Sequence, residues 1–107
     1  MMGSESGGYL MGKALEIYNR HKAEIREIAS RYPVANIRVF GSIIHGDDKD
    51  ASDIDLLVDA LSEATLFDLG GLQDELQELL GINVDLLTPG DLPPRFRASV
   101  ISKARPV

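Results

Sequence analysis

The stretch FGSIIHGDDKDASDIDLLVD (residues 40–59) decides how this chain folds, because it joins two strand-like segments through a Gly-Ser turn and a polar loop. Six aspartates lie in it, and the first three stand among polar and small residues, as in a solvated loop: Asp47, Asp48 and Asp50. Asp53 and Asp55 differ, because they alternate with apolar residues. Strand side chains point alternately to opposite faces, so we expect Asp53, Asp55 and Leu57 to share one face.

The chain before this stretch predicts a helix followed by a strand. Apolar residues recur at helical spacing over 13–32, and Pro33 ends this helix. NIRVFGS (36–42) alternates apolar and polar residues before Gly41, which predicts a short strand that stops at a turn.

The chain after this stretch predicts a helix, a strand and a second helix. A leucine stripe over 65–80 predicts a helix with Gly81 as its C-cap. INVDLL (82–87) predicts a third strand, with Asp85 inside it. A last helix follows, with Asp91 as its N-cap and prolines in its first turn.

The order helix, strand, strand, helix, strand, helix predicts an α/β (α+β) fold. A loop joins the first two strands, which favours antiparallel pairing, and a helix joins the second and third, which favours a right-handed parallel crossover. We therefore expect a small mixed sheet of about three strands with helices packed on one face. Asp53, Asp55 and Asp85 would lie on the other, partly open face.

Length and composition fit one small cytoplasmic domain. The chain has 107 residues, of which we assign 1–12 to a flexible leader and 13–107 to the domain. It has no cysteine, which excludes disulfides and thiolate metal sites, and no run long enough to cross a membrane. The net charge of −6 argues against tight direct binding to nucleic acid and suits metal ions, metal-bound nucleotides or basic proteins. Homo- and hetero-oligomers both stay open.

The aspartates and the Gly-Ser turn have complementary chemistry. Carboxylates that share one face repel each other unless cations lie between them, and Asp is a ligand that suits Mg²⁺. Two such ions can activate an attacking oxygen and stabilise a leaving pyrophosphate. Gly41 lets the backbone approach a ligand, and N–H groups at the turn, with the Ser42 hydroxyl, can bind phosphate. A phosphate-binding turn about ten residues before metal ligands is typical of nucleotidyl transfer.

These motifs resemble those of a known superfamily. GSIIHG (41–46), followed by SDIDLLVD (52–59), resembles the Gly-Ser…Asp-x-Asp signature of the DNA polymerase β-like nucleotidyltransferases. The short length and VDLLTPGDLPP (84–94) resemble its minimal nucleotidyltransferase (MNT) members, many of which are antitoxins encoded beside HEPN-domain toxins.

The resemblance implies a role for each motif residue. Gly41 and Ser42 would hold the triphosphate of ATP as cofactor-binding residues. Asp53 and Asp55 would ligate two Mg²⁺ ions, and Asp85 would ligate the catalytic ion and help to deprotonate the attacking hydroxyl. The implied activity is transfer of AMP from ATP to a tyrosine of the HEPN-type toxin, which would block its RNase activity.

One residue departs from the resemblance. His45 stands where family members often have Arg, in a Gly-Ser-x-x-Arg-Gly pattern. A neutral imidazole is a weaker phosphate clamp than a guanidinium, so the substitution leaves the strength of the activity open. His45 also has a plainer interpretation as a surface residue.

The same residues have structural interpretations. Asp53 and Asp55 would then be solvated residues at a strand end, and Gly41-Ser42 a simple turn. Asp85 would pair with a nearby cation such as Arg38. At the level of function, the alternatives are a non-catalytic module that neutralises a toxin by forming a complex, and nucleotidyl transfer to a small molecule or RNA. The last would need a partner chain or a dimer, since the chain has no room for an additional helical domain.

Overall fold

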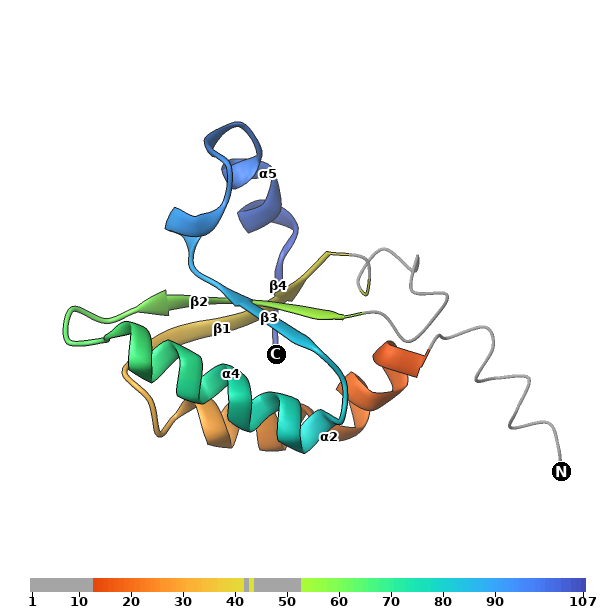
Figure 1. Ribbon diagram of the computed structural model, residues 1–107. Helices are drawn as coiled ribbons and strands as arrows, with labels where there is room; N and C mark the ends of the chain where they lie inside the picture. The colour runs from red at the N-terminus through yellow and green to blue at the C-terminus, as the bar shows by residue number, and fades with distance from the viewer. Residues whose placement is uncertain (1–12, 42, 44–52) are drawn as a thin grey trace, which may run out of the picture.

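A four-stranded mixed sheet forms the centre of the computed structural model, which describes residues 13–41, 43 and 53–107. The helices and strands are α2 (Lys13–Ala29), β1 (Val34–Phe40), β2 (Ile54–Ala60), α4 (Leu66–Leu80), β3 (Val84–Leu87), η1 (Pro89–Asp91), α5 (Pro94–Lys103) and β4 (Arg105–Pro106). Helices α2 and α4 cover one side of the sheet, the helix face, and α5 stands on the opposite side, the open face (Figure 1). The predicted α/β fold is confirmed.

The sheet has the order β3-β2-β1-β4. As predicted, β1 is antiparallel to β2, and β2 is parallel to β3 across the α4 crossover. The sequence predicted three strands, and the fourth is the short β4, which pairs antiparallel with β1. A strand of two residues carries no alternation of its own, so only its partner defines it.

Alternation in β2 separates the two faces of the sheet. Ile54, Leu56 and Val58 are fully buried, as the pattern predicts. Side chains from α2 and α4 meet the strand from the helix face, and the most buried of them are Ile25, Leu72 and Leu76. Full burial of such a side chain contributes about 1.5–3 kcal/mol relative to exposure. This core fixes which face of β2 carries the aspartates.

Helix α4 forms where it was predicted, but it begins at Leu66 rather than at residue 65. Thr65 is its N-cap and forms a capping box with Asp68, in which the Asp68 N–H donates to Thr65 Oγ1 at 3.2 Å and the Thr65 N–H to Asp68 Oδ2 at 2.9 Å. Gly81 is the C-cap, in the left-handed conformation with φ 73°. The helix therefore begins and ends where its sequence requires.

Helix α2 is shorter than predicted. It ends at Ala29 and not at Tyr32, because the chain tightens into a turn before Pro33. The N–H groups of Arg31 and Tyr32 donate to carbonyls three residues back, at 3.0 and 3.1 Å, where an α-helix would reach four residues back.

Two features of the open face were not expected from the sequence. Asp91 is not the N-cap of α5, a position that Pro93 occupies; instead, its Oδ2 atom accepts hydrogen bonds from the N–H and hydroxyl of Thr88, at 3.0 and 3.1 Å. Leu57, which shares a face with Asp55, is fully buried rather than exposed. The nearby η1 turn and the buried Leu92 show that the segment after β3 covers this part of the face.

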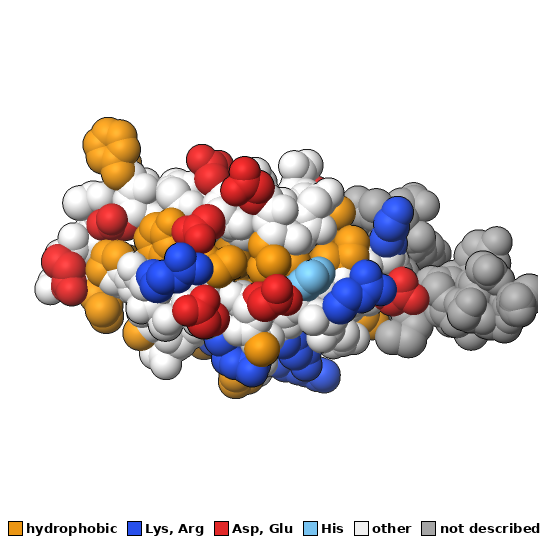
Figure 2. Space-filling view, turned by 90° about the horizontal axis from the view of Figure 1, so that it is seen from below, with side chains coloured by type: hydrophobic (Ala, Val, Ile, Leu, Met, Phe, Trp, Pro, Cys, Tyr) orange, Lys and Arg blue, Asp and Glu red, His pale blue; other side chains and the backbone are white. Residues whose placement is uncertain are grey.

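The outer sides of α2 and α4 carry acidic and basic side chains interspersed (Figure 2). Arg31, for example, contacts Glu27 within α2 and Glu75 on α4, at 3.5 and 3.4 Å. Within the described part of the chain, no helix has the length and apolarity that crossing a membrane requires.

Candidate active site

Two aspartates lie side by side on neighbouring strands. Asp55 of β2 and Asp85 of β3 are direct partners in the parallel register, and neighbouring strands lie about 4.8 Å apart. Both are on the open face, since Ile54 and Val84 beside them are buried on the helix face. Asp55 is half-buried and Asp85 is exposed. We call Asp55 and Asp85 the carboxylate pair.

The carboxylate pair is electrostatically strained. Burial is the largest of the causes that together raise the pKa of the Asp55 carboxyl to about 6, and Asp85 contributes by its charge and by a hydrogen bond that favours protonated Asp55. The charge of Asp53, which is exposed just before β2, raises the Asp55 pKa further. No basic group among the described residues offsets these effects. The site therefore attracts a cation.

Gly41 brings the turn after β1 against Asp55. Its φ is 84°, in the left-handed region that favours glycine. A Cβ atom at this position would collide with the Asp55 carboxylate. Phe40, the residue before it, is the register partner of Asp55 in the antiparallel pair. Glycine is thus required at position 41 both by its backbone conformation and by its contact with the carboxylate pair.

Some predicted residues lie outside the described part of the chain. They are Ser42 and His45 of the turn and Asp47, Asp48 and Asp50 of the loop. Ile43, between the first two, is buried in the core cluster.

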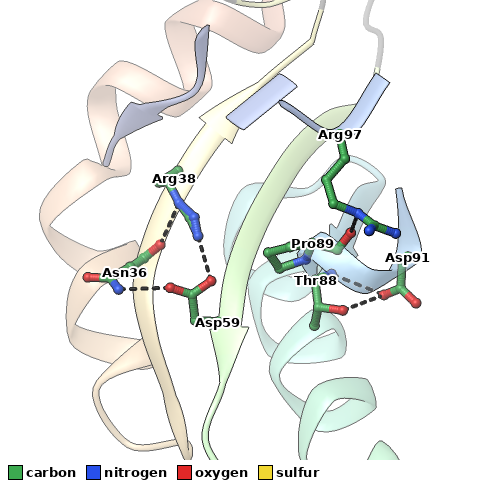
Figure 3. A network of polar contacts seen from close by, with 7 residues as sticks. All are labelled: Asn36, Arg38, Asp59, Thr88, Pro89, Asp91 and Arg97. Atoms are coloured by element: carbon green, nitrogen blue, oxygen red, sulfur yellow. Dashed lines mark hydrogen bonds and ion pairs between the residues drawn. The ribbon is translucent and has the colours of Figure 1, made fainter. Parts of the chain in front are cut away.

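Arg38 does not pair with Asp85. Its Nη2 atom donates to Asp59 Oδ1 at 2.7 Å, on the same strand as Asp55 (Figure 3). Asn36 Nδ2 donates to the other Asp59 oxygen at 2.8 Å, and these two hydrogen bonds, Asn36 first, lower the pKa of Asp59. Asn36 has a φ of 54° in a segment where the β1–β2 register shifts. The structural interpretation of Asp85 as an Arg38 partner is therefore wrong.

The sequence reasoning missed the Asn36–Arg38–Asp59 cluster. The only signal in the sequence is Asn36 inside a predicted strand. Asn tolerates a positive φ, and its short amide can reach a neighbouring strand. That signal becomes readable only when the register shift is known.

The carboxylates of the site suit a hard divalent cation but are too few to fill the coordination shell of the ion. Over 13–41, 43 and 53–107, no three acidic or histidine side chains are close enough to form a full ligand group. Asp55 and Asp85 supply a pair of carboxylates, with Asp53 near enough to act on the Asp55 pKa. Mg²⁺ is usually held by one or two carboxylates, and water and substrate phosphates complete its octahedron. The residues present therefore suit Mg²⁺ bound together with a phosphate ligand.

A separate cavity of about 320 Å³ lies between α2, β1 and β4. Its walls include Tyr18, Lys22, Val39 and Arg105, and no aspartate of the described residues. Val39 belongs to the core on the helix face, so this cavity is not the place of the carboxylate pair.

A family model described as a nucleotidyltransferase domain matches residues 22–107. The chain belongs to the nucleotidyltransferase domain family. Protein adenylyltransferase MntA of Thermococcus cleftensis is 38% identical over 85 residues, which are 79% of this chain and 83% of that protein. The resemblance to nucleotidyltransferases and the assignment as an enzyme of this family are therefore confirmed.

Solved structures of this family share the fold. A structure described as a minimal nucleotidyltransferase superposes with a TM-score of 0.77 at 34% identity, over 87% of this chain and 95% of that one. A toxin–antitoxin crystal structure with AMP-PNP superposes with a TM-score of 0.67 at 22% identity, over 79% of this chain and 70% of that one. At that identity, the second likeness shows the fold alone.

Proposed function

We propose that this nucleotidyltransferase is Mg²⁺-dependent, transfers AMP from ATP to a hydroxyl of a HEPN-type toxin and acts as its antitoxin. The observation that carries the proposal is the carboxylate pair, which lies on the open face of the sheet with the Gly41 turn against it. The MntA relative supports a protein as the acceptor, because its name is that of a protein adenylyltransferase. The toxin–antitoxin structure with AMP-PNP supports ATP and a toxin as ligand and partner.

Each residue of the proposed site would have its own role. Asp53 and Asp55 would hold two Mg²⁺ ions, Asp85 would share the catalytic one, and Gly41 and Ser42 would bind the triphosphate. Bound Mg²⁺ would polarise the phosphates and neutralise the charge of the leaving pyrophosphate.

The reaction is an in-line displacement. The acceptor hydroxyl oxygen attacks the α-phosphorus of ATP, and the bond from that phosphorus to the bridging oxygen of the β-phosphate breaks. AMP stays on the acceptor, and pyrophosphate leaves. The hydroxyl proton passes to Asp85, which is exposed on the open face, where an acceptor can reach it.

The test is transfer of label from α-labelled ATP to the purified toxin in the presence of Mg²⁺. We expect wild type to label the toxin, and Asp53→Asn and Asp55→Asn to label it only weakly. Asp59→Asn is the matched control, because Asp59 lies on the same strand and face but pairs with Arg38. Absence of labelling by wild type, together with full neutralisation of the toxin in cells by Asp55→Asn, would contradict the proposal.

The second candidate is a non-catalytic antitoxin that neutralises its toxin by stoichiometric binding. It is favoured by the incomplete ligand group among the described residues. Neutralisation would then need no ATP and would survive Asp53→Asn and Asp55→Asn. Labelling of RNA or a small molecule in place of the toxin would instead identify a different acceptor.

A further inference from the structure

The last part of the chain, residues 88–107, crosses the open face of the sheet. We call this segment the C-terminal arm. It leaves the sheet at β3 and returns at β4, and these two strands lie at opposite edges of the order β3-β2-β1-β4. Figure 1 shows α5 on the side of the sheet away from α2 and α4. The arm therefore stands on the same face as the carboxylate pair.

The C-terminal arm has hydrogen bonds within itself near its start and to other elements at its end. Near its start, Arg97 Nε donates to the Pro89 carbonyl at 2.8 Å (Figure 3). Arg97 Nη2 donates to the Leu92 carbonyl at 3.1 Å. At its end, the Val107 N–H donates to the Ile37 carbonyl of β1 at 3.2 Å. Arg26 Nη1 on α2 donates to the Val107 carbonyl at 3.0 Å. The Arg97 contacts join α5 to the segment after β3, and the Val107 contacts tie the end of the arm to β1 and α2.

Helix α5 itself has no buried residue. Phe96 is 53% exposed and Ile101 39% exposed. A helix of ten residues is marginal in water, and most helices gain their stability by packing an apolar side. The Phe96 ring is 53% exposed in the isolated domain, so a partner that covered it would add packing stability to α5.

The exposed side of α5 combines this ring with positive charge. Phe96, Ser99 and Lys103 follow the spacing i, i+3, i+7 and so share a side of the helix. The Arg95 guanidinium lies 5.4 Å from the centre of the Phe96 ring. Aromatic residues, phenylalanine among them, and arginine are enriched in protein interfaces.

The positive charge of the C-terminal arm indicates the charge of the surface that would bind it. Residues 92–107 contain four of the chain's 11 basic residues and none of its 17 acidic ones: Arg95, Arg97, Lys103 and Arg105. This contrasts with the mixed charges on the outer sides of α2 and α4 (Figure 2). An acidic protein surface complements this arm. A nucleic acid fits less well, because the same face of the sheet presents the carboxylate pair to its phosphates.

We propose that α5 is the docking element for the acceptor protein, which meets it with an acidic surface and an apolar pocket for Phe96. The inference rests on the proposed function, because the acceptor hydroxyl must enter from the open face on which the arm stands. Docking there would convert the encounter of hydroxyl and nucleotide into a reaction within one complex.

The test compares two exposed phenylalanines. Phe67 is 92% exposed in the first turn of α4, beyond the end of β2 that lies away from Asp55, and is the matched control. We expect Phe96→Ala to raise the KM for the toxin by about 10-fold or more, the size typical of an interface anchor. The KM for ATP and the rate at saturating toxin should stay unchanged, and Phe67→Ala should behave like wild type. The double variant Arg95→Glu, Lys103→Glu should raise the same KM and remove its salt dependence.

Calorimetric binding of the toxin to Asp55→Asn, with and without Phe96→Ala, separates docking from catalysis. If wild type transfers no AMP but Phe96→Ala still weakens binding, the docking proposal stands and the catalytic one fails. The docking proposal is overturned if Phe96→Ala and the charge-reversed variant keep the toxin KM and affinity within about twofold of wild type, or if Phe67→Ala carries the loss. It is also overturned if the charge-reversed variant loses binding to a single-stranded RNA probe but still binds the toxin. The same holds if the only effect of Phe96→Ala is that a dimer of this chain dissociates in a sedimentation experiment.

Discussion

Asp55 and Asp59 lie on the same strand and the same face, four residues apart, and their surroundings are opposite. Asp59 accepts hydrogen bonds from Asn36 and Arg38, which lower its pKa. Burial, Asp85 and Asp53 raise the pKa of Asp55 to about 6. The fold supplies hydrogen-bond donors to Asp59, whereas no cationic side chain of the described residues offsets the charge of Asp55.

The difference separates a structural carboxylate from a functional one. Asp59 holds the shifted register of β1 in place and needs no ligand. Asp55 costs stability when it is ionised, and a bound cation would return that free energy as affinity. A perturbed carboxyl on an open face is where a binding site is expected on physical grounds.

Replacement of the second member of the carboxylate pair should have the largest effect. We expect Asp85→Asn to lower the rate of AMP transfer at least about 100-fold, since even residues that only orient a metal ligand cost about 10–100-fold when removed. Asp59→Asn should stay within about twofold of wild type. Initial rates with α-labelled ATP measure both, and similar losses in the two variants would erase the distinction between the two carboxylates.

Gly41→Ala tests the contact between the turn and Asp55. We expect it to lower the free energy of unfolding by about 2–4 kcal/mol, which combines a left-handed backbone penalty of about 1–2 kcal/mol with the collision at Asp55. Gly81→Ala is the matched control, because Gly81 has a similar φ of 73° but no atom near its added Cβ. Urea unfolding measures both variants.

A double variant isolates the collision at Gly41. Adding Asp55→Ala to Gly41→Ala should recover the part of the loss that exceeds the Gly81→Ala value. If the double variant is no more stable than the sum of its single changes predicts, Gly41 and Asp55 are not in contact.

The pH dependence of Asp55→Asn should reveal the raised pKa. Folding raises the Asp55 pKa from 3.8 to about 6, so the native metal-free protein binds more protons between these values, and its stability falls as the pH rises through that range. We expect Asp55→Asn to raise the Tm at pH 7.5 by about 5 °C, which for a domain of this size is roughly 1 kcal/mol. At pH 4 the gain should vanish, because Asp55 is then protonated. A gain that is equal at both pH values would show that the Asp55 carboxyl is not perturbed.

Asp59→Asn should change the stability by a similar amount with the opposite sign. The lowered pKa means that ionised Asp59 contributes stability above its unfolded value of 3.8, and this contribution is lost as the pH falls through the lower folded value. We expect a loss of about 1 kcal/mol at pH 7.5, because the partner Arg38 is largely buried while Asp59 is partly exposed. Thermal unfolding at pH 7.5 and below pH 3 measures this loss of stability. If the loss persists at the lower pH, it comes from packing and not from the charge of Asp59.

The sequence predicted the elements whose signals are local. Gly81 was predicted as the C-cap of α4 and is confirmed, whereas the capping box of Thr65 and Asp68 at the start of the helix was not predicted. The alternation in β2 was enough to place Asp55 opposite the buried Leu56. The boundary of α2 was predicted three residues too late, because a turn before a proline also has helical spacing.

The features that the sequence did not predict depend on which strands are neighbours in the sheet. Two-residue β4 and the burial of Leu57 both follow from the return of the C-terminal arm across the sheet. The partner of Arg38 follows from a register shift in β1 that no local pattern encodes. Ser42, the other half of the predicted phosphate turn, lies outside the described residues, and its role stays a prediction.

By itself, the sequence determined that Asp55 lies on the face of β2 opposite Leu56 and that a glycine turn precedes it, because alternation and turn chemistry act over a few residues. Only the tertiary structure decided that Asp85 stands beside Asp55 while Arg38 goes to Asp59, and that α5 stands over the open face. Side chains on different strands meet according to register and strand order, and these are set by packing of the whole core rather than by any one segment.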